Sequence, residues 1–222
     1  MSSHHFVKEG QEPALIIANG EACSNELLGQ LLEWSPFIVV LDGAMNRVAD
    51  LGIKIDVLLG DFDSRSDGLD FVSNHMNIEI VHTPDQNKTD LQKGIEFLIE
   101  RGYSAVNILW ATGKRADHNL SNITDIVRFK HLINIVIHDD YSKIYVIPTT
   151  FKKWYAKDTP ISLMPVGEVL GISTSGLLYN MENETLILGY KTSSSNQVAQ
   201  DGFIQIQHKE GNLLLMECKD ID

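Results

Sequence analysis

The chain has 222 residues, of which 43% are hydrophobic and 22% charged, a composition typical of a globular protein with a sizeable core. Its 18 lysine and arginine residues stand against 30 aspartate and glutamate residues, a formal net charge of −12. This balance argues against a nucleic acid or an anionic membrane held by bulk charge. It is compatible with a small polyanionic substrate, because a divalent cation can bring phosphate to an acidic site.

The cysteines and the first residues bear on the cellular compartment. Cys23 and Cys218 lie near opposite ends of the chain and match no metal or redox spacing, so we expect them to be reduced. The start, MSSHHFVKEG, has no apolar segment, and no run in the sequence approaches the ~20 residues of a membrane helix. We therefore expect a cytoplasmic protein without a membrane partner.

The first two thirds of the chain alternate short apolar runs with helical patterns. The runs are ALIIANG (14–20), FIVVLDG (37–43), DVLLGDF (56–62), IEIVHTP (78–84), AVNILWA (105–111) and INIVIHDD (133–140). Strands buried on both faces of a sheet have this character. The clearest helix is TDLQKGIEFLIERG, where Thr89 and Gln92 form a capping-box pattern, and HNLSNITDIVRFK is a second. The alternation predicts a Rossmann-like α/β domain of three layers, with a mostly parallel sheet between helices.

The pattern changes near residue 148. Beyond KIYVIPTT come the strand-like runs ISLMPVG, GLLYN, ETLILGY, FIQIQHKEG and NLLLMEC, separated by Gly, Asn and Ser. HKEGN, between two of these runs, is typical of a hairpin turn, and SSSNQ (193–197) of a hairpin rim. We therefore predict an α/β domain over 1–148 and a small antiparallel sandwich or barrel over 149–222.

The stretch LLGDFDSRS places two aspartates just past an apolar run. In an extended backbone Asp61 and Asp63 point the same way, and like charges that close repel unless a proton or a cation lies between them. Asp42 and Asp85 end other runs. One aspartate at a strand end is more typical of a solvated turn. Several at successive strand ends favour a metal–phosphate site, because these ends meet at one edge of a parallel sheet.

Two strand-to-helix junctions add further charged side chains. Asp90 begins a helical pattern, where it either stabilises the helix dipole or, with Lys88 and Lys93, belongs to a phosphate site at the helix N-terminus. GKRADH offers Arg115 for a bidentate phosphate contact, with a surface Arg115–Asp117 pair as the alternative. The sequence has neither a G-x-x-x-x-G-K-[ST] loop nor a G-x-G-x-x-G fingerprint.

Four segments, in order, resemble the motifs of the thiamine pyrophosphokinase family. They are LDGAMNRVADLGIKIDVLLGDFDS, TPDQNKTDLQKGIEFL, ATGKRADHNLSNI and SGLLYNMENETLILGYKTSSSNQV. The resemblance implies an α/β domain followed by a small antiparallel β-sandwich, in a homodimer. Three positions differ from the family pattern: Lys114 stands where a second glycine is common, Tyr179 where tryptophan is frequent, and Gln197 where glutamate is usual.

The resemblance also implies a reaction and its residues. The thiamine hydroxyl attacks the β-phosphorus of ATP, which transfers pyrophosphate and releases AMP. Mg²⁺ is expected at Asp61, Asp63 and Asp90, with Asp42 close by. Catalysis is expected at the same three aspartates and Gln86, with an aspartate of this cluster as general base. ATP binding is expected at Asp42, Asn46, Arg47, Ser64, Asp85, Lys93, Gly113, Arg115 and Asp117. Thiamine binding is expected near the dimer interface, at Tyr179, Ser195 and Asn196.

Three alternatives stay open at this stage. The first is a pyrophosphokinase for another hydroxymethyl heterocycle, such as a pterin, which shares a G-D-x-D-like signal. The second is a non-catalytic regulator that binds thiamine or a nucleotide. The third is a metal-dependent phosphohydrolase, which would release phosphate from ATP without an acceptor.

Overall fold

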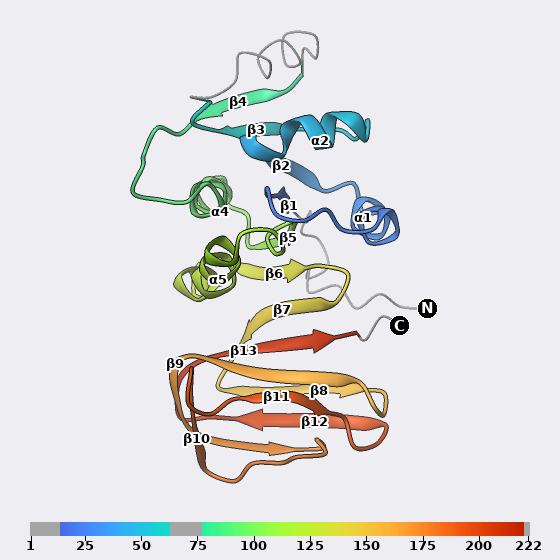
Figure 1. Cartoon of the computed structure of the whole chain (residues 1–222), viewed down its shortest axis with the longest axis vertical. Helices are drawn as coiled ribbons and strands as arrows, with labels where there is room; N and C mark the ends of the chain where they lie inside the picture. Colours follow the sequence, from blue (N-terminus) through green and yellow to red (C-terminus); the bar gives the residue numbers. More distant parts are fainter. Residues whose placement is uncertain (1–13, 63–76, 220–222) are drawn as a thin grey trace. The chain divides into compact units, whose positions relative to one another are not determined.

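The computed structural model describes residues 14–62 and 77–219 (Figure 1). Contacts divide the chain into two compact units. The first comprises the residues up to Asp125 together with Phe129–Asp139, and the second comprises Ile126–Arg128 together with the residues from Asp140 onward. No helix in the described part of the chain is long and apolar enough to cross a membrane.

The first unit contains a parallel sheet with the strand order β4-β3-β2-β1-β5-β6. The strands are β1 (Ala14–Ile17), β2 (Phe37–Leu41), β3 (Val57–Gly60), β4 (Glu79–His82), β5 (Ala105–Leu109) and β6 (Asn134–His138). Each neighbouring pair is parallel. Every strand falls within one of the apolar runs, so the predicted strands and their parallel pairing are confirmed.

Helices pack against both faces of this sheet. They are α1 (Asn25–Leu32), α2 (Met45–Asp50), α4 (Asp90–Glu100) and α5 (Ala116–Asp125), with short 3₁₀ segments η1 (Asp42–Ala44) and η2 (Ile126–Phe129). Leu28 of α1 and Val48 of α2 share one apolar cluster with Leu15 of β1. On the opposite face, α4 comes so close that a Cβ on Gly94 would lie 3.5 Å from Ile16 Cδ1. Leu15 and Ile16 point to opposite faces because successive strand side chains alternate.

Local sequence determines where α4 begins. Thr89 Oγ1 accepts a hydrogen bond from Gln92 N at 3.2 Å, and Gln92 Oε1 accepts one from Thr89 N at 3.3 Å. This is the predicted capping box, which satisfies two amides that the first helical turn leaves unpaired. The predicted stop is also observed, because Gly102 follows the helix with φ +82°.

The second unit is antiparallel β-structure from β7 onward. Its strands are β7 (Ser142–Ile147), β8 (Thr150–Tyr155), β9 (Pro160–Ser175), β10 (Glu184–Ile187), β11 (Ser193–Gln197), β12 (Gly202–Gln207) and β13 (Glu210–Cys218). β9 has 16 residues and pairs with β10, β11, β12 and β13. Between Asp140 and Lys219 the structure contains no helix, as the sequence predicted.

Three local predictions for this unit are wrong. GLLYN is a turn, because Gly176 has φ +87° and the Asn180 side chain bonds back to the backbone of Leu177. The polar segment SSSNQ is instead strand β11, since β9 offers it a pairing edge. HKEGN is no hairpin turn, because β12 pairs with β8 and β9 whereas β13 pairs with β7 and β9.

Candidate active site

A cleft of about 490 Å³ opens at the carboxyl ends of the parallel strands in the first unit. Residues that follow β1, β2, β3 and β5 line it, together with the start of α4 and three residues of α5, His118, Asn119 and Asn122. This is the edge at which open α/β sheets bind ligands. The lining includes these residues of the predicted site: Asp42, Asp61, Gln86, Asp90, Lys93, Gly113 and Arg115.

Glycines let the carboxylate-bearing turns approach one another. A Cβ on Gly60 would lie 2.3 Å from Asp42 Cγ, and a Cβ on Gly43 would lie 2.3 Å from Asn19 Nδ2. Contacts that short are not tolerated, so side chains at these two positions would displace their neighbours. The Asp42 carboxylate therefore lies directly on the backbone at the end of β3, where it accepts a hydrogen bond of 3.3 Å from Phe62 N.

The electrostatics of Asp42 reflect a concentration of negative charge. Burial raises the pKa of Asp42, and repulsion from Asp90 and Asp61 raises it further, against the lowering effect of hydrogen bonds from the backbone of Phe62 and Gly43. The ionised form of this carboxyl is therefore costly without a compensating cation. Hard carboxylate oxygens are the ligands that Mg²⁺ prefers, so the residues present fit that ion chemically.

The described residues alone do not complete a metal cluster. Across 14–62 and 77–219, no group of three or more His, Cys, Asp or Glu side chains is arranged to hold a metal ion. Asp63, predicted as a metal ligand, and Ser64, predicted as an ATP-binding residue, both lie outside the described residues.

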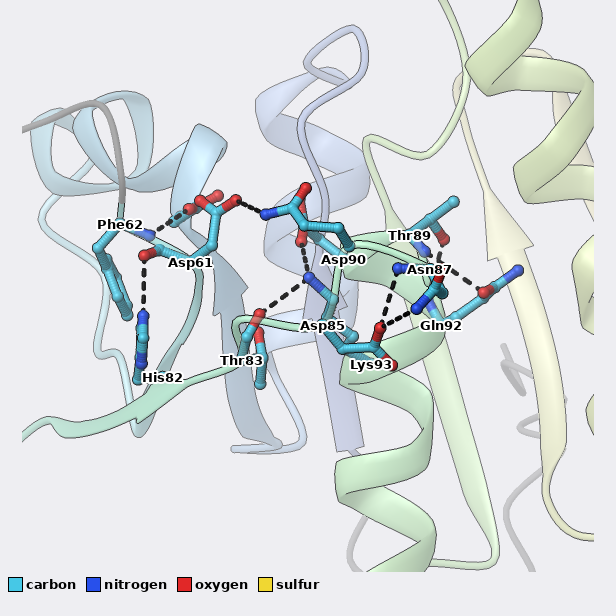
Figure 2. A network of polar contacts seen from close by, with 12 residues as sticks. Asp61, Phe62, His82, Thr83, Asp85, Asn87, Thr89, Asp90, Gln92 and Lys93 are labelled. Carbon is cyan, nitrogen blue, oxygen red and sulfur yellow. Dashed lines mark hydrogen bonds and ion pairs between the residues drawn. The ribbon is translucent and has the colours of Figure 1, made fainter.

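Asp61 is held from two sides at the rim of β3. Gln86 Nε2 donates to Asp61 Oδ2 at 3.3 Å, which brings together two of the predicted catalytic side chains. His82 Nε2 lies 3.1 Å from the backbone oxygen of Asp61, and its ring stacks on that of Phe62 (Figure 2).

Lys93 is a buried cation at the start of α4. Its side chain is only 6% exposed. Its Nζ donates to the backbone oxygen of Thr83 at 3.0 Å and to Asp90 Oδ1 at 3.2 Å (Figure 2). The same ammonium therefore ties the loop after β4 to the helix and orients the Asp90 carboxylate. Asp85 does not line the cleft within the described residues, and its Oδ1 accepts hydrogen bonds from N and Nδ2 of Asn87.

The Arg47 side chain contacts residues that follow β1 and β5, and it does not line the described cleft. Its Nη2 donates to Asn19 Oδ1 at 2.9 Å, and its guanidinium lies 4.5 Å from the centroid of the Trp110 ring. Neither Arg47 nor the exposed Asn46 lines the cleft formed by the described residues. Arg47 therefore joins the turn after β1 to the end of β5.

The loop between β5 and α5 has two successive left-handed residues. Gly113 has φ +75° and Lys114 has φ +57°. A glycine would adopt the second value at less cost than a residue with a Cβ does. Lys114 Nζ donates to the backbone oxygen of Asn19 at 3.1 Å.

Arg115 and Asp117 form an ion pair at the start of α5. Arg115 Nε lies 3.1 Å from Asp117 Oδ1, and this hydrogen-bonded pairing lowers the pKa of Asp117 to about 2. Arg115 lines the cleft, whereas Asp117 is not among the described lining residues.

The predicted thiamine-binding residues lie together in the second unit. Asn196 Nδ2 donates to the backbone oxygen of Tyr179 at 2.7 Å, and Tyr179 N donates to Asn196 Oδ1 at 3.1 Å. Tyr179 is 67% exposed and Asn196 is 2% exposed. Ser195 is exposed and has φ +56°.

Several residues that shape the cleft had no predicted role. Asn19 accepts from both Arg47 and Lys114, and the buried Asn122 donates from Nδ2 to the backbone oxygen of Ala111 at 2.7 Å. The position of Asn19 at the end of an apolar run was the available sequence signal. Asn122 lies in ATGKRADHNLSNI, one of the segments that resemble the family motifs, and that resemblance was its sequence signal.

The fold and the cleft define an α/β protein with a carboxylate-lined cleft at the ends of parallel strands. A family model described as "Thiamin pyrophosphokinase, catalytic domain" matches residues 28–137, and one described as "Thiamin pyrophosphokinase, vitamin B1 binding domain" matches residues 148–213. Thiamine pyrophosphokinase 1 of Oryza sativa subsp. japonica is 30% identical over 192 residues, 73% of this chain and 72% of its own. Thiamin pyrophosphokinase 1 of Caenorhabditis elegans is 27% identical over 202 residues, 81% of this chain and 79% of its own.

Solved structures share the fold. Yeast thiamin pyrophosphokinase matches with a TM-score of 0.84 at 18% identity, covering 96% of this chain and 88% of its own. Thiamine pyrophosphokinase from Bacillus subtilis matches with a TM-score of 0.80 at 22% identity. The match covers 95% of this chain and 100% of the Bacillus subtilis chain. The chain belongs to the thiamine pyrophosphokinase family, and its class is therefore that of the diphosphotransferases.

Proposed function

We propose that this chain transfers pyrophosphate from ATP to the hydroxyl of thiamine and so forms thiamine diphosphate and AMP. Family membership supports the reaction. Within the structure, the observation that carries the proposal is the convergence of Asp42, Asp61 and Asp90 on one cleft that Lys93 and Arg115 also line. Carboxylates for a metal beside cations for phosphate are what transfer of a phosphoryl-type group requires.

We assign the two substrates to different parts of the chain. ATP would bind to the Rossmann-like α/β domain predicted over 1–148, and thiamine to the β-sandwich predicted over 149–222. The homodimer and the cytoplasmic location stay predictions, the first from the family resemblance and the second from the sequence.

Mg²⁺ is the metal that we expect at the carboxylates. Asp61, Asp63 and Asp90 would hold it, with Asp42 close by. When bound, it would neutralise charge on the phosphate chain. The raised pKa of Asp42 supports this assignment, because a cation would offset both the burial that mainly raises it and the repulsion from Asp90 and Asp61 that adds to it.

The protein's own groups would orient the reactants. Gln86 would hold Asp61 in position through its hydrogen bond of 3.3 Å, and Lys93 would do the same for Asp90. An aspartate of this cluster would accept the proton of the thiamine hydroxyl as it attacks the β-phosphorus.

The remaining residues of the predicted ATP site are assigned by family resemblance. Arg115 would contact phosphate directly, since it lines the cleft with its side chain 73% exposed. Loop positions and supporting side chains make up the rest: Asn46, Arg47, Ser64, Asp85, Gly113 and Asp117.

In the second unit Tyr179, Ser195 and Asn196 would form the thiamine site, where the exposed tyrosine suits a flat, cationic heterocycle.

A single assay tests the reaction. Purified protein is incubated with ATP, Mg²⁺ and thiamine, and AMP and thiamine diphosphate are quantified. We expect equal amounts of both, and none after chelation of the metal. AMP without a thiamine product would indicate another acceptor, with a hydroxymethyl pterin tried next. Phosphate release without an acceptor would indicate a phosphohydrolase, and no turnover by a folded protein that binds thiamine would indicate a regulator.

Two variants of cleft aspartates and one control variant connect the assay to the cleft. Asp61→Asn removes one carboxylate charge and is expected to lower kcat by about 100-fold or more, and Asp63→Asn is expected to behave alike. Asp50→Asn is the control, because Asp50 is the exposed last residue of α2 and does not line the described cleft. Near-normal turnover by Asp61→Asn would remove this carboxylate from the proposed mechanism.

A further inference from the structure

We propose that Asn196 affects thiamine binding through Tyr179, by fixing the turn that carries the tyrosine, and that it makes no contact with the ligand. This inference rests on the proposed thiamine-binding role of the second unit. It gives Asn196 a different role from the direct contact that the sequence motif suggests.

The Asn196 side chain uses its full hydrogen-bonding capacity within the protein. Its Nδ2 donates to the backbone oxygen of Tyr179 at 2.7 Å and to Ser193 Oγ at 3.2 Å. Its Oδ1 accepts from Tyr179 N at 3.1 Å and from Gln197 N at 2.9 Å. A primary amide has two N–H groups and two acceptor sites, so all four are occupied. A thiamine contact would require at least one of these bonds to break.

Burial supports the same conclusion. Asn196 is 2% exposed, so little of its surface is available to a ligand. Tyr179, which it holds by both backbone groups, is 67% exposed. The buried Asn196 thus supports the backbone, and Tyr179 presents its aromatic ring to solvent.

The turn around Tyr179 is fixed by neighbouring bonds as well. Leu178 N donates to the backbone oxygen of Gln197 at 2.8 Å. The Asn180 side chain closes the turn, because its Nδ2 donates to Leu177 O at 2.9 Å and its Oδ1 accepts from Leu177 N at 3.2 Å. An exposed aromatic side chain on a preorganised backbone binds a flat ligand with less loss of conformational freedom.

Ser195 is the member of the same motif that is exposed. The register between β11 and β9 shifts between Ser193 and Asn196, and Ser195 within this irregularity has φ +56°. Its backbone N–H donates to Ser162 Oγ at 3.0 Å, whereas the residue itself is exposed. The structure therefore separates the motif into a supporting amide and an exposed hydroxyl.

A double-mutant cycle tests this division. Tyr179→Ala removes the ring and keeps the backbone groups that Asn196 binds, whereas Asn196→Ala removes the support. We expect each single variant to raise the KM for thiamine by roughly tenfold and to leave the KM for ATP within about twofold. We expect the double variant to match Tyr179→Ala within about twofold, because there is no ring left to position. Multiplied effects, about 100-fold together, would show that Asn196 contacts thiamine independently and would overturn the proposal.

Amide hydrogen exchange gives a second readout that needs no activity. In Asn196→Ala the amides of Tyr179 and Gln197 lose their acceptor and should exchange about fivefold faster or more, since an amide without its hydrogen bond is less protected. Asn196→Asp keeps that acceptor oxygen and should protect these amides better than Asn196→Ala does. Asn196→Asp also replaces Asn196→Ala in the double-mutant cycle if Asn196→Ala does not fold.

The two readouts separate failure of the inference from failure of the proposed function. A wild-type protein that does not convert thiamine would contradict the proposed function, while unchanged exchange at Tyr179 and Gln197 in Asn196→Ala would contradict the positioning role. Faster exchange combined with an unchanged thiamine KM would also overturn the proposal, because the turn would then be irrelevant to the ligand.

Discussion

The ammonium of Lys93 joins two elements of the cleft: it lies 3.2 Å from Asp90 Oδ1, one turn away on α4, and 3.0 Å from the backbone oxygen of Thr83. A buried ammonium needs such partners, because a charge removed from water without them is very costly. The contact therefore binds the loop after β4 to the helix that carries Asp90.

Replacement of this ammonium should reduce both activity and stability. Lys93→Met keeps the length of the buried chain but leaves Thr83 O without its donor and Asp90 without its counter-charge. We expect the free energy of unfolding to fall by about 1–3 kcal/mol and kcat to fall by about tenfold or more. Denaturant unfolding and steady-state kinetics measure the two effects. Lys54→Met is the control, since Lys54 pairs with Asp56, its side chain is 76% exposed and it does not line the described cleft; equal losses in both variants would contradict the prediction.

The close approach of Gly60 to Asp42 predicts a substitution that displaces the carboxylate. A Cβ at residue 60 would lie 2.3 Å from Asp42 Cγ and from Asp42 Oδ2, so Gly60→Ala must move the side chain or the turn. We expect kcat/KM to fall at least tenfold and stability by about 1–3 kcal/mol.

A second glycine provides the matched control. Gly29 in α1 has no atom within 4 Å of an added Cβ, so Gly29→Ala should raise the free energy of unfolding by about 1 kcal/mol and leave activity unchanged. Full activity in Gly60→Ala would mean that the position of Asp42 is unimportant for turnover.

Arg47 should be sensitive to replacement by lysine although the charge is retained. The planar guanidinium lies over Trp110 at 4.5 Å and donates to Asn19 at the same time, and a lysine ammonium cannot reproduce this geometry. We expect Arg47→Lys to raise the KM for ATP by about threefold to tenfold, with a changed Trp110 fluorescence. Unaltered fluorescence and kinetics would argue that the contact does not shape the cleft.

Glu217 in the second unit should make stability depend on pH. Its Oε1 accepts from Tyr145 at 2.5 Å, Lys153 at 2.6 Å and Tyr155 at 2.7 Å. Burial by itself would raise the pKa of Glu217, but these hydrogen bonds outweigh burial and lower the pKa below the ordinary value of 4.5. The carboxylate therefore stabilises the folded state above pH 4.5, and this contribution is lost as the pH falls through the lowered pKa.

The variant Glu217→Gln should remove that contribution. At neutral pH we expect its free energy of unfolding to be lower than that of the unmodified chain by about 2 kcal/mol. The difference should shrink as the pH falls below 4.5, which unfolding curves at several pH values would measure. Glu210→Gln, at an exposed position of the same strand, should change little at any pH. A difference that stayed constant with pH would show that the charge of Glu217 is not what stabilises the fold.

The sequence by itself determined the local elements of the first unit. Short apolar runs are sufficient to specify the parallel strands, although the edge strand β4 is largely exposed, and the capping box of Thr89 and Gln92 lies within one helical turn. Asp42 and Asp61 could be recognised as site candidates for the same reason, because each follows its strand directly. These features depend on residues close together in the chain, which is why their pattern is visible without a structure.

Only the tertiary structure decided which partner each side chain takes. Arg47 reaches Trp110 because β1 lies between β2 and β5 in the sheet, an order that no local pattern specifies. SSSNQ is a strand because it pairs with β9, and the Asn196 side chain bonds to the backbone of Tyr179, 17 residues away in the sequence. Pairing and burial depend on residues far apart in the sequence, so composition and periodicity do not contain them.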